Sequence, residues 1–306
     1  MIVKDALKQG YPFVEAIASA LPICDEFLVS DGYSTDGTYE ALQKISKANP
    51  KVKIHRYKWP DKMGLTMIAD ITNEVRSKCR FQYIFSVQAG EIIHEQSAPY
   101  IKALPTMFPT IETFSFPYIS LLNKYRYAEG FRLRFSKNLP QIMAVDDAWT
   151  LGISEAFIRT KTLRSLANPQ RLFNRVTNGI QYVYANTCFG EYSRAIYLPN
   201  PIFRYWSLFP KNFLEKNEGH RKLLHIPFSA KTSDILQAHI NEPELFWKLG
   251  IKALFQARHK SVISYPEGYG LINRQDHPSI IQEFISNPKI DHYYIREELF
   301  ELIGKL

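Results

Sequence analysis

The chain has few cysteines and no long apolar run. Cys24, Cys79 and Cys188 are its 3 cysteines in 306 residues. They are odd in number and far apart, so they form neither a Cys-x-x-Cys metal pair nor a disulfide framework. We therefore expect a reducing compartment, with Cys24 and Cys79 as buried structural thiols. No apolar stretch approaches the roughly 18–20 residues of a membrane span, and no signal-peptide pattern opens the chain. These absences predict a soluble, cytoplasmic protein.

Motifs for nucleic-acid binding are also missing, although the formal net charge is +8. The basic residues are scattered, with local concentrations only at 124–137 and 252–260. No helix-turn-helix, zinc-finger or RNP-type aromatic motif accompanies them. A basic nucleic-acid-binding protein stays an alternative. Peripheral contact with an anionic membrane surface, or a negatively charged small substrate, explains the same charge excess.

The first hundred residues alternate between strand and helix patterns, which are assigned from hydrophobic spacing. The expected elements after a short apolar start are helix 11–24, strand 26–30, helix 34–47, strand 51–59, helix 65–79 and strand 81–88. Ser34 or Thr35 is expected to cap the second helix, with Asp36 in its first turn. This order and these short connections predict an α/β fold with a mostly parallel sheet flanked by helices.

The pattern changes in the second half of the chain. Two strand-like stretches within 110–137 predict a mixed or antiparallel part of the sheet, and helical patterns dominate beyond about residue 205. We therefore expect an α/β core over 1–205 and a mainly helical C-terminal extension over 206–306 that packs on it. No internal repeat or low-complexity linker separates the two.

Polar residues follow two of the expected strands. Asp31 ends one apolar run in "VSDGYSTDGTYEAL" (29–42), and Gln88 to Glu91 end another in "YIFSVQAGEIIHE" (83–95). Open parallel sheets bind ligands at the carboxyl ends of their strands. A carboxylate there, followed by a Gly-containing turn into a helix, suits recognition of a nucleotide.

Together these stretches resemble family 2 glycosyltransferases, which have the GT-A nucleotide-sugar transferase fold. "EFLVSDGYSTDGTYEAL" is similar to the family's "DEIIVVDSGSTDGT", and "YIFSVQAGEIIHE" to "WIFYLQADEVIHE" of one branch. The segments "FRLRFSKNLPQIMAVDDAW" and "FRYWSLFPKNFLEKN" follow in the order of that branch. The resemblance spans about residues 2–220 and implies fold and superfamily, but not the substrate.

The resemblance implies roles for particular residues. Asp31 would contact the nucleotide base, Asp36 would help to hold the loop, and Val3 and Gln88 would contact the nucleotide sugar. In the family, an acid of the DxD or QxD segment holds Mg²⁺ or Mn²⁺, which neutralises the charge that builds on the leaving diphosphate.

This chain departs from the pattern at the metal site, because Gly90 replaces the acid that would face the metal. Three interpretations stay open: Glu91 or His94 substitutes as the ligand, the enzyme works without metal, or catalysis is lost. A structural role is the alternative for His94.

An inverting transferase also needs a general base, and the resemblance assigns it to "AVDDAW". Asp147 is our first candidate for this base and Asp146 the second. Trp149 close by could offer a face for a sugar ring. The alternative interpretation is that the two acids lie in a solvated turn without a catalytic role. Arg204, in "PIFRYW", would contact the diphosphate in place of a metal, because arginine pairs with phosphate oxygens in a bidentate manner. An ion pair that packs the C-terminal region is its alternative role.

The predicted function is transfer of a sugar from a nucleotide-diphosphate donor to a hydroxyl of a saccharide, a lipid-linked sugar or a surface polymer, with inversion. The alternatives are a degenerate protein of the same fold that binds a nucleotide or a partner without catalysis, and the nucleic-acid-binding protein above.

Overall fold

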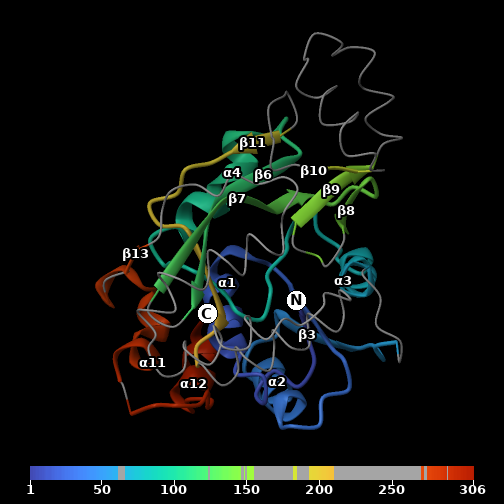
Figure 1. Cartoon of the computed structure of the whole chain (residues 1–306). Coiled ribbons are helices and arrows are strands. Elements are labelled where there is room, and N and C mark those ends of the chain that lie inside the picture. The colour runs from blue at the N-terminus through green and yellow to red at the C-terminus, as the bar shows by residue number, and fades with distance from the viewer. Residues whose placement is uncertain are drawn as a thin grey trace, which may run out of the picture.

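The computed structural model describes residues 1–60, 66–122, 125–145, 148, 150–154, 182–184, 193–209, 270–271, 274–287 and 289–306. These residues form an α/β fold with a parallel three-stranded sheet, a mixed seven-stranded sheet and a small antiparallel sheet (Figure 1). Its helices are α1 (Phe13–Ala20), α2 (Thr38–Ala48), α3 (Met67–Ser77), α4 (Ala98–Met107), α11 (Gln282–Ser286) and α12 (Glu298–Lys305). Its first strands are β1 (Ile2–Val3), β2 (Phe27–Asp31), β3 (Val52–Arg56), β4 (Tyr83–Phe85), β5 (Glu91–Ile93), β6 (Thr113–Leu122) and β7 (Tyr125–Lys137). The later strands are β8 (Ile142–Val145), β9 (Thr150–Ser154), β10 (Tyr182–Tyr184), β11 (Ser193–Ala195), β12 (Ile202–Ser207) and β13 (Gly270–Leu271).

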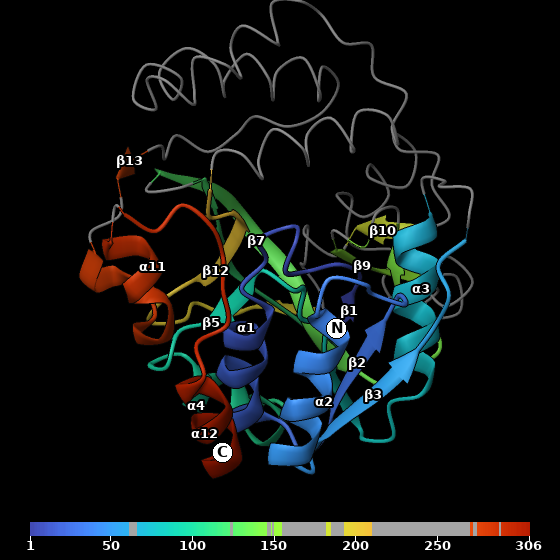
Figure 2. The ribbon, with the colours of Figure 1, turned by 90° about the horizontal axis from the view of Figure 1, so that it is seen from below.

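The parallel sheet has the order β1-β2-β3. Its register pairs Val3 with Asp31 and Asp31 with Arg56, so the carboxyl ends of the three strands lie at one edge. Helices α2 and α3 lie on opposite sides of this sheet (Figure 2). The alternation of strand and helix expected for residues 1–80 is therefore confirmed.

Helix α1 is almost entirely buried. Pro12 precedes it, and Phe13, Val14 and Ile17 are 0% exposed. Burial of such side chains stabilises the fold by roughly 1.5–3 kcal/mol each. The helix packs against β5 and so joins the parallel part of the fold to the mixed sheet.

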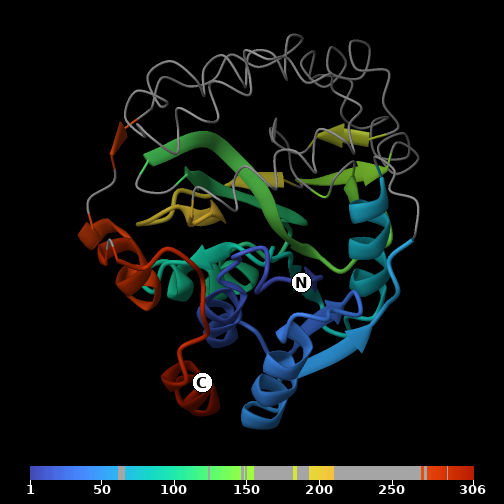
Figure 3. The ribbon, with the colours of Figure 1, turned by 60° about the horizontal axis from the view of Figure 1, so that its bottom comes forward.

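The mixed sheet has the order β13-β7-β6-β12-β5, with β11 beside β6. Figure 3 shows β6 and β7 as a long curved pair that crosses the molecule. Strand β4 pairs with β7 in antiparallel fashion and not with β1. In the described part of the chain, the expected parallel sheet thus comprises β1 to β3, because the fourth strand joins the antiparallel β6–β7 hairpin; the mixed sheet also has parallel pairs, of β6 with β11 and with β12.

Helix α2 begins later than expected. Gly37 has a left-handed φ of 97°, which an α-helix does not accommodate, and the helix starts at Thr38. The Ser34 side chain accepts a hydrogen bond from the backbone of Asp5 instead of capping the helix. Asp36 therefore precedes the helix, and its predicted place in the first turn is wrong.

The described C-terminal residues pack on the first half of the chain. Helix α12 contacts α1 and α2, and Asn49 Nδ2 donates to the carbonyl of Ile303 at 2.8 Å. Residues 210–269, most of the helical extension expected over 206–306, lie outside the described residues. None of the helices in the described part is long and apolar enough to cross a membrane.

Candidate functional site

Asp31 is fully buried at the end of β2. Its Oδ2 accepts hydrogen bonds from the backbone N–H of Tyr33 at 3.1 Å and from Nε of Arg56 at 3.0 Å. Its Oδ1 accepts the backbone N–H of Ser34 at 3.2 Å. The acid stands at the predicted strand end, but its carboxylate binds donors of the protein itself.

Arg56, the last residue of β3, was missed by the sequence analysis. Its guanidinium carbon lies 4.1 Å from the ring centroid of Tyr33 and 3.9 Å from that of Tyr39. Tyr33 is 50% exposed and has a φ of 61°. The sequence places Arg56 inside the predicted strand 51–59, and its register with Asp31 cannot be read from one strand alone.

Asp36 holds two loops together. Its Oδ2 accepts the backbone N–H of Lys8 at 2.7 Å, and its Oδ1 accepts that of Thr38 at 3.0 Å. The Thr35 backbone in turn donates to Asp5 Oδ1 at 2.8 Å. The loops that follow β1 and β2 are thereby tied at the carboxyl edge, as the loop-holding role expected for Asp36 requires.

Gly90 lies directly against the backbone of β12. A Cβ at this position would stand 2.6 Å from the carbonyl oxygen of Tyr205, and the Gly90 carbonyl accepts the Tyr205 N–H at 2.7 Å. An aspartate, which the resemblance would place here, does not fit this backbone arrangement. Gly90 is required here for close packing of two backbone segments.

Glu91 is 1% exposed and is held in a buried ion pair. Its Oε1 accepts Nη2 of Arg134 at 2.7 Å and the hydroxyl of Tyr118 at 2.6 Å. Its Oε2 accepts the backbone N–H of Gln88 at 3.1 Å. Burial is the largest single influence and lowers the pKa of Arg134, but the charge of Glu91, the oxygen of Tyr118 and the hydrogen bonds to both together outweigh it, so the net pKa is raised. Both oxygens of Glu91 are engaged, so its role as a metal ligand stays a prediction without support from these contacts.

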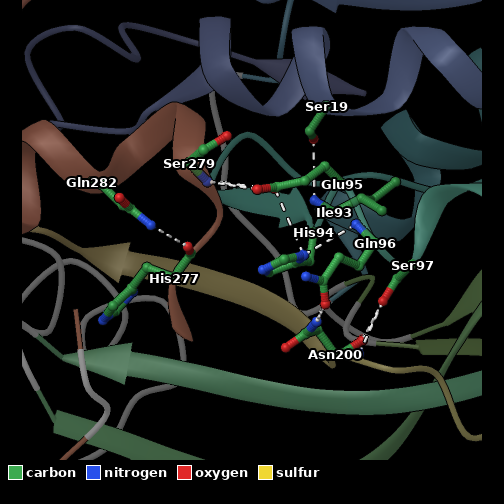
Figure 4. A network of polar contacts seen from close by, with 10 residues as sticks. All are labelled: Ser19, Ile93, His94, Glu95, Gln96, Ser97, Asn200, His277, Ser279 and Gln282. Atoms are coloured by element: carbon green, nitrogen blue, oxygen red, sulfur yellow. Dashed lines mark hydrogen bonds and ion pairs between the residues drawn. The ribbon is translucent and has the colours of Figure 1, made fainter. Parts of the chain in front are cut away.

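His94 lies in a separate polar network, shown in Figure 4. It is 4% exposed, its Nδ1 accepts the backbone N–H of Gln96 at 3.1 Å, and its ring packs beside Phe203. The neighbouring Glu95 accepts the backbone N–H of Ser279 at 3.2 Å. These contacts favour the structural role of His94, and the neighbouring Glu95 joins the segment after β5 to the C-terminal residues.

A cavity of about 910 Å³ lies between β1 and the segment that contains β4. Its wall includes Val3, Lys4, Gln88, Gly90 and Arg204. The structure therefore brings three predicted residues, Val3, Gln88 and Arg204, to one cavity. Three others, Asp31, Asp36 and Glu91, are not part of its lining.

The cavity wall carries positive charge. Arg204 is half-buried on β12, and Lys4 Nζ lies 5.7 Å from the ring centroid of Trp59. Burial raises the pKa of the Tyr11 phenol, and the positive charge of Arg204 partly offsets that rise. An anionic ligand in this cavity would meet two cationic side chains near the carboxyl end of β1.

Arg76 is a second cationic residue that the sequence analysis missed. It is 7% exposed, and it donates to the hydroxyls of Ser86 at 2.9 Å and Ser136 at 3.1 Å. Burial lowers its pKa to about 10. Its guanidinium is hydrogen-bonded to neutral groups and lines the same cavity.

Asp146, Asp147 and Trp149 lie outside the described residues. The positions on either side are anchored: Asn73 exchanges two hydrogen bonds with the backbone of Ala144, at 2.9 and 2.7 Å. Gln88 Nε2 donates to the carbonyl of Ala148 at 3.2 Å. The assignment of a catalytic base to either acid therefore remains a prediction.

The residues present do not fit the expected divalent metal. Within the described ranges, no group of three or more His, Cys, Asp or Glu side chains is placed to hold an ion. Gly90 has no room for a carboxylate, and the oxygens of Glu91 bind Arg134, Tyr118 and Gln88. We therefore assign no step to Mg²⁺ or Mn²⁺.

The chain matches no known protein-family model, and comparison with curated proteins finds no significant match.

Proposed function

We propose that this protein is a glycosyltransferase of the GT-A type that moves a sugar from a nucleotide-diphosphate donor to a hydroxyl acceptor, with inversion. The acceptor would be a saccharide, a lipid-linked sugar or a surface polymer. The observation that carries the proposal is the cavity beside β1, whose wall combines Val3, Gln88 and Arg204. The cavity runs along β1, and its lining includes Val3 and Lys4 at the carboxyl end of that strand, the end at which open α/β sheets bind nucleotides.

Charge stabilisation in this scheme comes from the chain itself. When the bond between the anomeric carbon and the diphosphate oxygen breaks, negative charge builds on the leaving group. Arg204 and Lys4 on the cavity wall would stabilise it electrostatically. The acceptor hydroxyl would lose its proton to Asp147 or Asp146 as it attacks the opposite face of the sugar.

The setting of the reaction follows from its chemistry. Nucleotide-sugar donors suit a cytoplasmic enzyme, and the net charge of +8 suits peripheral contact with an anionic membrane surface that carries a lipid-linked acceptor.

Binding of a nucleotide without sugar transfer is the second candidate. Gly90 favours it, because the position of the metal-site acid is filled by the backbone of β12. Turnover separates the two candidates: release of nucleoside diphosphate from a nucleotide sugar, dependent on acceptor, supports transfer, and binding without release supports the second.

Calorimetric titration of Arg204→Ala with GDP, CDP, UDP and dTDP, in EDTA and again with Mn²⁺, tests the proposed site. We expect binding to wild type that Mn²⁺ does not strengthen, and about 10- to 100-fold weaker binding to the variant, because a charge-assisted contact is lost. Arg80→Ala is the matched control, since Arg80 is exposed and pairs with Glu26. Failure of all four nucleotides to bind wild type would overturn the proposal.

A further inference from the structure

Arg56 ends β3 at the carboxyl edge of the parallel sheet, and its side chain is partly exposed there. The side chain is 32% exposed and has three neighbours that hold it: Asp31, which pairs with its Nε, and the rings of Tyr33 and Tyr39, whose centroids lie 4.1 and 3.9 Å from its guanidinium carbon. An arginine held by an ion pair and by two aromatic rings has little freedom to move. Its orientation is therefore set before any ligand arrives.

The hydrogen-bond donors of this arginine are only partly used. Arginine has five N–H groups, and within the described part of the chain Asp31, through Nε, is the hydrogen-bond partner of the Arg56 side chain. Four N–H groups on the two terminal nitrogens remain. They form a planar fork that can donate to two neighbouring acceptors at once.

Asp31 is unsuited to contact a base directly. Its side chain is 0% exposed, and its two oxygens accept hydrogen bonds from Tyr33, Ser34 and Arg56. A uracil or thymine imide N–H would need a carboxylate oxygen that is open to the ligand. In this arrangement Asp31 orients Arg56, and Arg56 is the group that reaches outward.

A guanidinium that donates two parallel hydrogen bonds discriminates among bases by the pattern of donors and acceptors on their edges. Guanine presents adjacent acceptors at O6 and N7, which is the edge that arginine reads in DNA. Cytosine presents adjacent acceptors at O2 and N3. Uracil and thymine place an N–H between two carbonyls. Adenine places its amino group between N1 and N7, and the lone pairs of N1 and N3 diverge, so none of the three bases offers the fork two neighbouring acceptors on one edge.

We propose that Arg56 is the residue that selects the donor's base, and that the donor is a guanine or cytosine nucleoside diphosphate sugar whose base packs on Tyr33. This inference rests on the proposed function and places the base beside the cavity: Arg56 and Tyr33 do not line it, but Gly32, between Asp31 and Tyr33, lies against Trp59 of the cavity wall. The half-exposed ring of Tyr33 supplies a face for stacking without regard to base identity. Base selection and base stacking are thereby assigned to two different side chains.

Titration of GDP, CDP, UDP, dTDP and ADP into wild type and three variants tests the inference. Wild type should bind GDP or CDP at least about 10-fold more tightly than the other three nucleotides. The comparison of GDP with CDP shows whether the selected base is guanine or cytosine. Arg56→Lys keeps a positive partner for Asp31 but loses the fork, so the ratio should fall toward one. Tyr33→Asn, in which Asn tolerates the left-handed backbone, should weaken binding of all five by about 5-fold or more, and it should lower the ratio less than Arg56→Lys does, because Asp31 and Tyr39 still hold Arg56. Arg80→Lys, the control, should change neither the affinities for the five nucleotides nor their ratio.

The outcomes separate the two proposals. Tighter binding of UDP or dTDP to wild type, or an unchanged ratio in a folded Arg56→Lys variant, would overturn the assignment of Arg56 and leave the proposed function standing. If Arg56→Lys does not fold, the order of the five nucleotides on wild type decides alone. Absence of all binding would overturn the proposed function, and the inference with it.

Discussion

At the residue scale, Gly90 decides how closely β12 approaches the turn after β4. The Gly90 carbonyl accepts the N–H of Tyr205, and the Tyr205 carbonyl occupies the space where a side chain of residue 90 would begin. A backbone oxygen cannot move aside as the end of a flexible side chain can. The close approach of β12 therefore requires glycine at position 90 and excludes the acid expected there.

Gly90→Ala should lower the free energy of unfolding by about 1–3 kcal/mol, because the added Cβ overpacks two backbone segments. Gly304→Ala is the matched control: its Cβ would meet Ala48 at an ordinary 3.6 Å. In α12 that change should be neutral or stabilising by up to about 1 kcal/mol. Urea unfolding of both variants measures the difference, and equal stability of the two would contradict the packing role of Gly90.

The predicted site residues show what a single sequence can and cannot indicate. Asp31 and Gln88 could be placed at strand ends, because apolar runs end there. The partners of the acids could not be predicted, since Arg56 and Arg134 are 25 and 43 residues away from Asp31 and Glu91 along the chain. The register of β2 and β3 brings Asp31 to Arg56, whereas Glu91 on β5 and Arg134 on β7 meet although these strands are not neighbours in the sheet. Register and packing of this kind are not encoded in periodicity.

At the scale of elements, α3 and β8 are joined by one side chain. Asn73 on α3 donates Nδ2–H to the carbonyl of Ala144 and accepts the Ala144 N–H with Oδ1. This double contact imitates the pairing of a neighbouring strand. Strand β8 directly precedes Asp146 and Asp147 in the chain, so this contact holds in place the strand that leads to the two predicted acids.

Asn73→Ala should cost about 1–3 kcal/mol of unfolding free energy, because two backbone groups of Ala144 lose their partner. Gln43→Ala, which removes an exposed amide from α2, should change stability by less than about 0.5 kcal/mol. Thermal unfolding followed by circular dichroism compares them. Equal midpoints would show that the contact between α3 and β8 adds nothing to stability.

Local patterns predicted the elements of the first 80 residues well, since each helix and strand there carries its own periodicity and its own ends. The pairing of β4 with β7 was not predictable in this way. Both β1 and β7 have an edge at which β4 could pair. The pairing of β4 with β7 depends on the position of the long β6–β7 hairpin, which the local pattern of β4 does not encode. The late start of α2 was missed because Ser34 and Asp36 bind the loop at 5–8, a contact between segments that are remote in sequence.

At the scale of the whole molecule, the C-terminal residues close onto the first helix around a buried carboxyl group. Glu15 on α1 is 0% exposed, and its Oε2 accepts the hydroxyl of Tyr293 at 2.8 Å. Arg296 Nη2 lies 3.5 Å from Oε1. Burial raises the pKa of Glu15 from 4.5 to about 7, and the hydrogen bond from Tyr293 and the charge of Arg296 only partly oppose it.

This raised pKa makes stability depend on pH in a defined direction. Between pH 4.5 and about 7 the folded protein holds a proton on Glu15 that the unfolded chain has released. The contribution of this proton to the free energy of unfolding is complete below pH 4.5 and is lost as the pH rises through 7, a change of up to about 3 kcal/mol.

Glu15→Gln stays neutral, so its free energy of unfolding should rise relative to wild type across this window. Glu283→Gln, which removes an exposed carboxylate that contacts the same Arg296, should keep the wild-type profile. Urea unfolding at half-unit pH steps measures all three, and a Glu15→Gln profile parallel to that of wild type would show that Glu15 does not couple closure of the C-terminal residues to pH.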